Sequence, residues 1–340
     1  MFKQQLSDYV KYQIIKIQET CMHIKPLVEI RCFTYNQKNF IKETLDGFIN
    51  QKTNFSFVVL VHDDASDDGT TEIVKEYACQ YPDVILPILE SENQYSKRDG
   101  SLGYVMREAS NVTGAKYVAW CEGDDYWIDN LKLQMQVDFL ENNPDYGMCY
   151  TKVKTYQQNQ GMFNSEFGGD YESFKELLLK GNVLPTLTVI ARMKFTKTYN
   201  ETIGLRNNNW PMGDYPLWLF IAAESKIKFL NTITGVYRIL DESASHSLDN
   251  VKCLNFLYGY YTIKTFFRER YYPTNLNWQK KIDYIQFKSL LKLTLRSGSG
   301  SEECLKFLRH SYLSRITKFL LSLLCSKTLC FLLQKLYKFN

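Results

Sequence analysis

Short apolar, β-rich runs alternate with stretches of helical periodicity between residues 27 and 153. In the stretches between the runs, such as Phe40–Ile49 and Thr70–Gln80, apolar residues recur at helical spacing. Strands separated by helices of about ten residues need crossover connections. The pattern therefore predicts an α/β fold with a mostly parallel sheet flanked by helices. The predicted strands are Val28–Phe33, Phe55–Val61, Val84–Leu89, Lys116–Cys121 and Met148–Val153.

The pattern divides the chain into three parts. A length of 340 residues suits one large domain with an appendage, or two domains. The first part, residues 1–25, has weak helical character and is followed by Pro26. The alternating pattern defines the second part, an α/β domain over residues 26–248. The third part, residues 249–340, is mostly basic and helical, and we expect it to form a C-terminal extension.

Beyond residue 155 the pattern becomes less regular. Gln157–Gly169 is polar and contains glycines, so we expect a loop there. Apolar spacing predicts helices at Ser173–Lys180 and Tyr215–Ala223. Two short β-rich runs, Ile227–Leu230 and Gly235–Leu240, predict two further strands.

Charge is spread unevenly along the chain. Residues 251–340 carry 16 Lys and Arg against 4 Asp and Glu, a net charge of +12, whereas the rest of the chain has a net charge of −8. The acidic part would repel phosphates and no recognition motif is present, so we expect no nucleic-acid partner. Within residues 310–340, apolar residues at helical spacing lie beside Arg315 and Lys318. This arrangement predicts association with a membrane surface. Packing on the α/β domain or a contact between copies in an oligomer is the alternative.

Cysteine usage and apolar segments bear on location. The nine cysteines are scattered without a CxxC pair, which favours a reducing compartment. Residues 1–25 lack the apolar core of a signal peptide. Polar residues interrupt the longest apolar-rich stretch, Phe319–Leu333, so it does not predict a spanning helix. We expect a cytoplasmic protein that can attach peripherally to the inner face of the membrane.

Acidic loops follow two of the predicted strands. Asp63-Asp64-Ala65-Ser66 follows the second strand, and Glu122-Gly123-Asp124-Asp125 follows the fourth. Parallel strands open their carboxyl ends on one edge of a sheet, so both loops can serve one ligand site. Adjacent carboxylates repel each other unless a cation lies between them, and Mn2+ or Mg2+ prefers such oxygen ligands. The alternative for each loop is a solvated turn that caps the next helix.

Other motifs are less specific. Gly213-Asp214 precedes an aromatic-rich helix, where Asp214 is either a general base or a helix cap. His246, in a serine-rich loop, is either a metal ligand or a surface residue. Lys97 and Arg98, after the third strand, either neutralise a diphosphate or belong to a solvated loop. Thr34-Tyr35-Asn36-Gln37 stands where a glycine-rich phosphate loop would follow the first strand, which argues against dinucleotide and P-loop chemistry.

In their order along residues 26–246, these motifs resemble the family 2 glycosyltransferases of the GT-A fold. Thr34-Tyr35-Asn36 looks like the turn after the family's first strand. Asp63 to Thr70 is similar to its D-D-x-S-x-D-G-T signature. Tyr117 to Trp127 resembles its D-x-D element, with Glu122 in place of the first aspartate, and Gly213-Asp214 resembles its catalytic-base element. The resemblance implies a Rossmann-like, mostly parallel sheet with helices on its faces.

The resemblance also implies a role for each residue. Thr34, Tyr35 and Asn36 would bind the nucleotide sugar at its base, with Asp64, or Asp63 as the alternative, on the uracil edge. Glu122 would support the site, and Asp124 would contact ribose or metal. Asp125 would be the principal ligand of Mn2+ or Mg2+, and His246 would reach the metal or the diphosphate. Asp214 would be the general base.

The implied reaction moves a sugar, with inversion, from a nucleotide sugar to a hydroxyl group of a glycan or a lipid-linked acceptor. UDP is the expected nucleotide, and surface glycan or glycolipid synthesis is the expected process. A Q-x-x-R-W element, typical of processive synthases in this family, does not follow Gln134–Gln136. One sugar per encounter is therefore expected. The alternatives are a nucleotidyltransferase that forms nucleotide sugars and a catalytically silent glycan-binding protein with the same fold.

Overall fold

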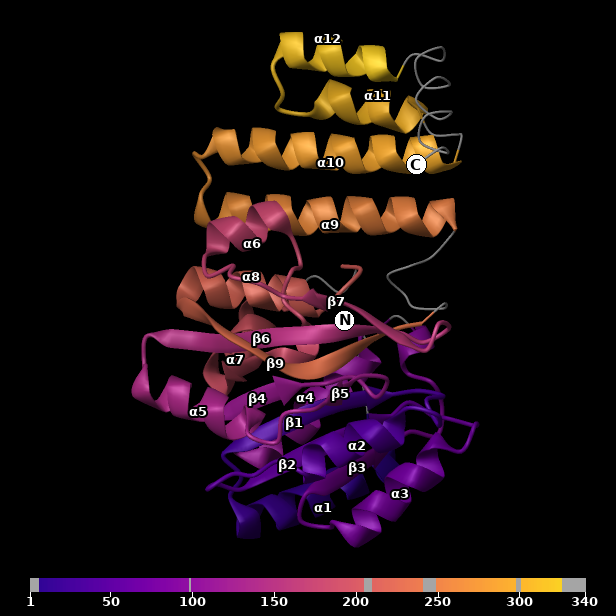
Figure 1. Cartoon of the computed structure of the whole chain (residues 1–340), viewed down its shortest axis with the longest axis vertical. Helices are drawn as coiled ribbons and strands as arrows, with labels where there is room; N and C mark the ends of the chain where they lie inside the picture. The colour runs from indigo at the N-terminus through magenta and orange to yellow at the C-terminus, as the bar shows by residue number, and fades with distance from the viewer. Residues whose placement is uncertain (1–5, 98, 205–209, 241–248, 298–300, 326–340) are drawn as a thin grey trace. The chain divides into compact units, whose positions relative to one another are not determined.

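The computed structural model describes residues 6–97, 99–204, 210–240, 249–297 and 301–325 (Figure 1). Two compact units make up the chain, and each has its own hydrophobic core. The first, called the sheet unit, comprises residues 1–173, 182–208 and 220–240. The second, called the helical unit, comprises residues 174–181, 209–219 and 241–340.

The described residues of the sheet unit form one nine-stranded sheet in the order β3-β2-β1-β4-β8-β6-β9-β5, with β7 beside β6. The first four strands in this order are parallel, and β6 and β9 are parallel to each other. Strand β8 runs antiparallel to both of its neighbours, β4 and β6. The mostly parallel sheet predicted from the sequence is thus confirmed. The strands are β1 (Val28–Thr34), β2 (Phe57–Asp63), β3 (Ile85–Leu89), β4 (Tyr117–Trp120), β5 (Tyr126–Trp127), β6 (Tyr146–Gln157), β7 (Met162–Phe167), β8 (Ile190–Arg192) and β9 (Lys226–Ile239).

Helices cover both faces of the sheet. Along β2, Val59 and Val61 join one core with α2, α3 and α5, whereas Val58 and Leu60 join another with α1 and α4. A strand that is buried on both faces has a continuous run of apolar residues, and this explains the apolar run of β2. The helices of this unit are α1 (Asp8–Ile24), α2 (Ile41–Ile49), α3 (Thr70–Gln80), α4 (Ser101–Thr113), α5 (Lys132–Asn142) and α7 (Met193–Thr202).

Helix α1 also protects the edge of the sheet. The side chain of Gln13 accepts a hydrogen bond from the backbone N of Leu89 at 2.7 Å and donates one to its carbonyl at 3.1 Å. Leu89 belongs to β3, the last strand on that side of the sheet. Exposed edge strands can pair with other chains, and a covering helix removes that possibility.

Three elements differ from the sequence prediction. Gln157–Gly169 is not simply a loop, because it contains β7, whose residues are almost all exposed and so show no apolar alternation. The two runs Ile227–Leu230 and Gly235–Leu240 belong to one strand, β9, because β9 pairs with β6 on both sides of the polar residues between them, with shifts of register in that stretch. Strand β5 has only two residues and gives no periodic signal.

The helical unit confirms the predicted helical C-terminal extension. Its core includes Phe287 and Leu290 on α10, Phe307 and Leu308 on α11, and Cys325 after α12. Helix α8 begins in the helical unit and ends in the sheet unit. Among the described helices, none is long and apolar enough to cross a membrane. The helices are α6 (Phe174–Lys180), α8 (Asp214–Glu224), α9 (Asn250–Tyr271), α10 (Leu276–Ser297), α11 (Ser301–His310) and α12 (Arg315–Leu324).

Candidate functional site

The carboxyl ends of β1, β2 and β4 meet at one edge of the sheet. Thr34, the last residue of β1, pairs in register with Asp63, the last residue of β2. Beyond the strand ends, the backbone N of Asp64 donates to the carbonyl of Thr34 at 3.0 Å, and that of Gly123 donates to Phe33 at 2.9 Å. The structure thus brings both acidic loops to the end of β1, the expected ligand position in an open α/β sheet.

Asn36 joins the loop after β1 to the loop after β2. Its backbone N donates to Ser66 Oγ at 2.9 Å, and its side-chain oxygen accepts from the backbone N of Asp67 at 3.0 Å. Asn36 has a φ of 51°, in the left-handed region that Asn tolerates better than most residues. Asn36 therefore fixes the shape of the turn.

Asp63 is buried and engaged within its own loop. Its Oδ1 accepts hydrogen bonds from Ser66 Oγ at 2.5 Å and from the backbone N of Ser66 at 3.2 Å. Its other oxygen accepts from the hydroxyl of Thr71, in the first turn of α3. Asp63 thus shapes the turn that leads from β2 into α3.

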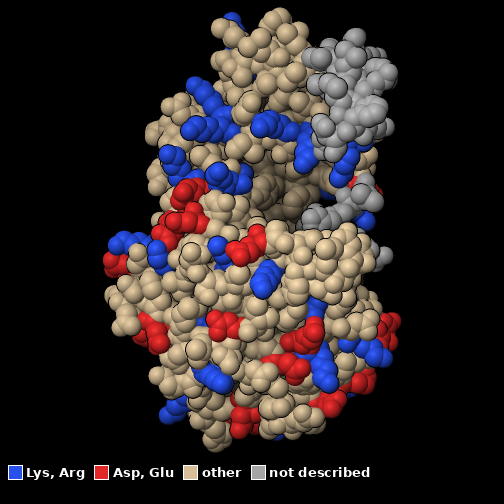
Figure 2. Space-filling model, viewed as in Figure 1, with Lys and Arg blue, Asp and Glu red and all other residues tan. Residues whose placement is uncertain are grey.

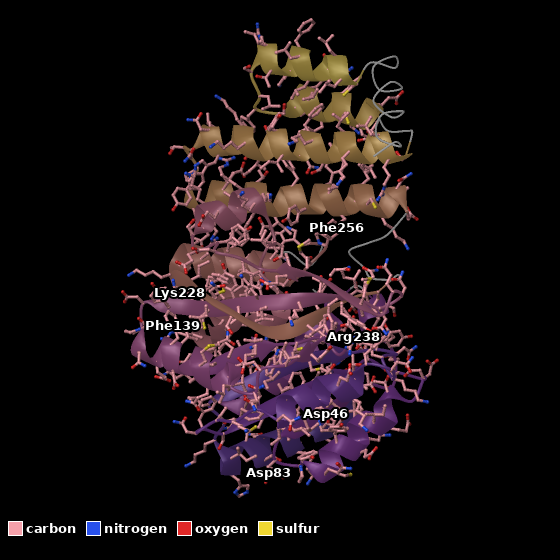
Figure 3. The ribbon with its side chains drawn as sticks, viewed as in Figure 1. Asp46, Asp83, Phe139, Lys228, Arg238 and Phe256 are labelled. Atoms are coloured by element: carbon pink, nitrogen blue, oxygen red, sulfur yellow. The ribbon has the colours of Figure 1, made fainter. Side chains whose placement is uncertain are left out.

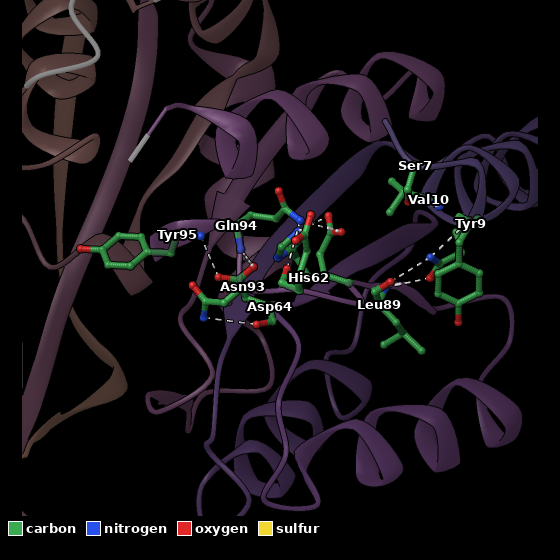
Figure 4. A network of polar contacts seen from close by, with 12 residues as sticks. Ser7, Tyr9, Val10, His62, Asp64, Leu89, Asn93, Gln94 and Tyr95 are labelled. Atoms are coloured by element: carbon green, nitrogen blue, oxygen red, sulfur yellow. Dashed lines mark hydrogen bonds and ion pairs between the residues drawn. The ribbon is translucent and has the colours of Figure 1, made fainter. Parts of the chain in front are cut away.

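Asp64 ties the end of β2 to the loop after β3 (Figure 4). Its Oδ1 accepts from the backbone N of Gln94 at 2.6 Å, and its Oδ2 accepts from that of Tyr95 at 3.0 Å. The Gln94 side chain donates to Glu90, which contacts the buried His62 at 3.3 Å. Each carboxylate oxygen of Asp64 keeps a further lone pair, so a ligand N–H group can still be accepted.

Among the buried side-chain N and O atoms of the described residues that lack a hydrogen-bond partner, two lie near Gly123. They are Thr34 Oγ1 and Gln37 Oε1. A Cβ atom at Gly123 would collide with Gln37 Oε1 and lie 2.9 Å from Thr34 Oγ1. Because buried polar groups almost always have partners, these two atoms are candidates to bind a ligand. Tyr35, between them in sequence, is 48% exposed and presents its ring to solvent.

The acidic turn, residues 122–125, is held from two sides. From α2, Thr44 Oγ1 contacts the carbonyls of Gly123 at 3.0 Å and Asp125 at 2.6 Å. From β9, the backbone N of Arg238 donates to Asp125 Oδ1 at 2.8 Å. Asp125 is buried, Asp124 is half-buried and Glu122 is exposed. The turn therefore presents its carboxylates in a fixed arrangement.

Burial disfavours the ionised form of the aspartates in this turn. It raises the pKa of Asp125 well above the usual value, and the neighbouring charges of Asp124 and Glu122 raise it further. Burial also raises the pKa of Asp124. A bound cation would favour the ionised form of both groups. Their oxygen atoms are ligands that Mn2+ and Mg2+ accept, so the residues fit a divalent metal ion.

The described residues alone do not complete a metal site, because no group of three or more His, Cys, Asp or Glu side chains among them could hold an ion. The remaining ligands of an ion at Asp124 and Asp125 would have to come from substrate, water or residues outside the described part. His246 and Arg98, two of the predicted site residues, lie outside the described residues.

Arg238, labelled in Figure 3, lies on β9 and is a site residue that the sequence did not predict. Its guanidinium donates to the carbonyl of Asp124 and to the carboxylate of Glu43. It lies over the rings of Tyr126, at 4.5 Å, and Phe40, at 5.1 Å. Burial lowers the pKa of Arg238 to about 10, so the group stays charged at neutral pH. A lone arginine inside an apolar strand was the available signal, since arginine is rarely buried without a partner.

Lys97 lies at the end of the 3-10 turn Tyr95–Lys97 and has partners of its own. Its ammonium group contacts Glu92 at 2.5 Å and Gln94 at 3.0 Å. The hydrogen bond to Glu92 raises the pKa of Lys97. To reach a diphosphate, Lys97 would have to leave Glu92.

Asp214 is the first residue of α8 and belongs to the helical unit. Its Oδ1 accepts from the backbone N of Tyr215 at 2.7 Å. Tyr215 is fully buried, stacks on Tyr260 and donates its hydroxyl to the carbonyl of Leu177 at 2.9 Å. The start of α8 is therefore firmly held, and the helix dipole favours a carboxylate at this position.

A family model and several known sequences match this chain. The model of the family described as "Glycosyl transferase family 2" matches residues 33–199. An uncharacterized protein of Mycobacterium tuberculosis is 33% identical over 214 residues, which are 62% of this chain and 58% of that protein. The match thus spans less than two thirds of the mycobacterial protein.

Two further relatives carry functional names. An uncharacterized glycosyltransferase of Methanocaldococcus jannaschii is 27% identical over 72% of this chain and 81% of its own length. The Escherichia coli protein WfaP, a UDP-Glc:alpha-D-GlcNAc-diphosphoundecaprenol beta-1,3-glucosyltransferase, is 25% identical over 64% of this chain and 80% of its own length.

Solved structures share the fold. Staphylococcus aureus TarS 1–349 in complex with UDP has a TM-score of 0.56 at 15% identity, covering 83% of this chain and 78% of that one. The Pyrobaculum calidifontis mannosyltransferase PcManGT, in complex with GDP-Man and Mn2+, has a TM-score of 0.52 at 14% identity, covering 97% and 96%. At such identities the likeness concerns the fold, and it confirms the predicted GT-A architecture.

Proposed function

The chain belongs to glycosyl transferase family 2, and we propose that it transfers a sugar from a UDP-sugar to an acceptor hydroxyl. The observation that carries this proposal is the pair of orphaned polar atoms, Thr34 Oγ1 and Gln37 Oε1, at the strand ends beside the acidic turn. A buried hydroxyl and a buried amide oxygen without partners suit a pocket whose ligand supplies them. The UDP bound by TarS supports uracil as the base.

In this proposal, residues after β1 and β2 bind the base. The exposed ring of Tyr35 offers a face on which a pyrimidine can stack. Asp64 would accept the N–H of the uracil edge through its remaining lone pairs. The Thr34 hydroxyl would bond to the nucleotide, while Asn36 and Asp63 would support the loop that they already shape.

Asp125 and Asp124 would hold Mn2+ or Mg2+, with Asp124 shared with the ribose. Their buried carboxylates support this assignment, and so does the Mn2+ present with PcManGT. When bound, the ion would offset the negative charge of the leaving diphosphate. Glu122, exposed beside them, would add negative charge, and His246 would be a further ligand.

Asp214 would act as the general base. Its carboxylate would accept the proton of the acceptor hydroxyl as that oxygen attacks the sugar from the side opposite the diphosphate. A single displacement of this kind inverts the anomeric centre. Asp214 is the first residue of α8, a position at which the helix dipole favours an acidic side chain, and this supports the assignment.

The proposed acceptor is a glycan or a lipid-linked sugar used to build surface glycans, and the proposed place of action is the cytoplasmic side of the membrane. The printed name of WfaP, whose acceptor is a diphosphoundecaprenol-linked sugar, supports a lipid-linked acceptor. The basic helical unit supports a location at a membrane surface.

A donor screen tests the proposal. The full chain would be incubated with Mn2+ and each of UDP-glucose, UDP-galactose, their N-acetyl forms and GDP-mannose, and nucleotide release would be measured. We expect release from one UDP-sugar and its loss in Asp125→Asn. Asp129→Asn is the matched control, because Asp129 lies in the same connection but caps the backbone of Leu131. Release from GDP-mannose alone would refute the proposal that the donor carries UDP. If no donor is bound and no nucleotide is released, the proposal that the chain transfers a sugar would be refuted.

A further inference from the structure

Helix α12 exposes a continuous apolar stripe. Its four members are Ile316, Phe319, Leu320 and Leu323, which are 75%, 64%, 57% and 47% exposed. At the helical spacing of 3.6 residues per turn, positions i, i+3, i+4 and i+7 fall on one face of the helix. An exposed apolar face of this kind indicates a surface that contacts another molecule or a membrane.

The opposite face of α12 packs against the helical unit, so α12 is an amphipathic helix with one buried face and one exposed apolar face. Leu321, Leu324 and Cys325 join the core of the helical unit. The helix start is capped by Ser314, whose Oγ accepts from the backbone N of Thr317 at 3.1 Å. The buried Asp283 accepts from the backbone N of Tyr312 at 2.5 Å and so holds the turn before α12. The direction in which the stripe faces is therefore fixed within this unit.

Positive charge predominates on the helices α10, α11 and α12 of the same unit. Residues 276–324 contain nine Lys and Arg but only three Asp and Glu, and one of these acids, Asp283, is fully buried. Figure 2 shows Lys and Arg side chains gathered on the helical unit. A second copy of this chain would bring the same positive charge, so its approach would be disfavoured. An anionic surface would be attracted. The exposed bases are Lys280, Lys281, Lys288, Lys292, Arg296, Lys306, Arg309 and Arg315.

We propose that α12 lies in the surface of an anionic lipid bilayer, with its apolar stripe among the acyl chains and the bases of α10, α11 and α12 attracted to the lipid phosphates. A helix of ten residues is far too short to span a bilayer, but it suits insertion parallel to the surface. The bilayer satisfies both observations at once, because it offers an apolar layer directly beneath a layer of negative charge.

Helix α1 provides the comparison that isolates the role of charge. It also exposes apolar side chains, with Tyr9, Tyr12 and Ile15 each about half exposed. Its bases are paired, since Lys11 contacts Asp8 at 2.8 Å and Lys16 contacts Glu19 at 3.2 Å. An equal loss of apolar surface from α1 therefore serves as a matched control.

Sedimentation with vesicles tests the proposal. The full chain would be mixed with vesicles of phosphatidylcholine alone or of equal parts phosphatidylcholine and phosphatidylglycerol. We expect binding to the mixed vesicles that weakens with salt. Combining Ile316→Ser, Phe319→Ser and Leu323→Ser should weaken binding by more than about tenfold. The control, Tyr9→Ser with Tyr12→Ser and Ile15→Ser, should bind like the parent.

Three results would overturn the proposal. The α12 variant could bind as tightly as the parent while its helical circular dichroism and UDP affinity are unchanged. The parent could fail to bind vesicles and instead form a dimer that the α12 variant dissociates. A chain ending at Cys325 could bind where the full chain does not, which would mean that residues 326–340 cover the stripe. Because vesicle binding needs no sugar donor, each of these results leaves the proposed transferase untouched.

Discussion

Replacing Arg238 with lysine tests whether its guanidinium holds the acidic turn in the form that binds the donor. Lysine keeps the charge but lacks the planar fork with which the guanidinium bonds to the Asp124 carbonyl and the Glu43 carboxylate. A hydrogen bond from a charged donor contributes about 1.5–3 kcal/mol. Glu43 is 60% exposed, so solvent screening leaves its ion pair less than about 1 kcal/mol. We therefore assign most of the effect to the bond with Asp124.

A loss of about 2 kcal/mol corresponds to roughly a thirtyfold change in an equilibrium constant. We expect Arg238→Lys to weaken UDP binding in the presence of Mn2+ by that factor, measured by calorimetry. We expect kcat/KM for the UDP-sugar to fall by a similar factor, mainly through KM, because in the variant the turn is held less firmly before the donor binds.

Arg192→Lys is the matched control. Arg192 is also a buried arginine of the sheet unit, and it donates to the carbonyls of Tyr146 and Leu140. It pairs with Tyr117 at the start of β4, the end of that strand away from the acidic turn. Its replacement should lower stability but leave UDP affinity unchanged. Equal losses of UDP affinity in both variants, or none in Arg238→Lys, would refute the positioning role.

Other substitutions separate binding from stability and from chemistry. Thr34→Val removes a hydroxyl that has no partner, so thermal stability should be maintained while UDP affinity falls about fivefold or more; a loss of stability alone would contradict this. Asp125→Asn removes a buried carboxylate, and burial raises the pKa of that group. The contribution of such a group to the stability of the fold is lost as pH rises through the raised pKa. The variant should therefore melt higher than the parent at neutral pH without metal, yet be inactive; a lower melting temperature would refute this. Because the pKa of Asp125 is raised, the affinity of the parent for Mn2+ should begin to fall, as the pH is lowered, at a pH above the usual aspartate pKa of about 4. Titrations with Mn2+ at several pH values would detect this. Asp214→Asn should keep UDP affinity but slow transfer by about a thousandfold, and a parallel loss of UDP binding would make Asp214 a binding residue.

The parts of the fold that could be predicted are those whose signal is local. Strand β2 is buried on both faces by separate sets of helices, so it reads as an unbroken apolar run. The positions of Asp63 and Asp125 followed from the same reasoning, since Asp63 ends one buried parallel strand and Asp125 lies in the loop after another. Strand β7 could not be predicted, because it is held by pairing with β6 while its side chains remain in solvent.

The sequence could not distinguish a carboxylate that binds a ligand from one that builds the loop. Asp63 and Asp64 are adjacent and both buried, yet Asp63 bonds within its own turn and Asp64 reaches the loop after β3. The partners of Asp64 are backbone N–H groups some thirty residues away, which carry no residue-type signal. The orphaned state of Thr34 and Gln37 likewise depends on what their surroundings fail to supply, and no local pattern reports it.

Arg238 shows how a distant strand completes the site. It lies 113 residues after Asp125 in the chain and reaches the acidic turn because β5 pairs antiparallel with β9, with Tyr126 opposite Val236. This pairing places a positive charge and a backbone N–H group against the turn, while Thr44 of α2 holds it from another side. The fold thus keeps two neighbouring carboxylates in place although burial raises the pKa of both. The guanidinium of Arg238 donates to the backbone carbonyl of Asp124, and the backbone N of Arg238 donates to the carboxylate of Asp125. The positive charge of Arg238 therefore does not bond to the carboxylate of Asp124, and a bound cation would stabilise that carboxylate in its ionised form.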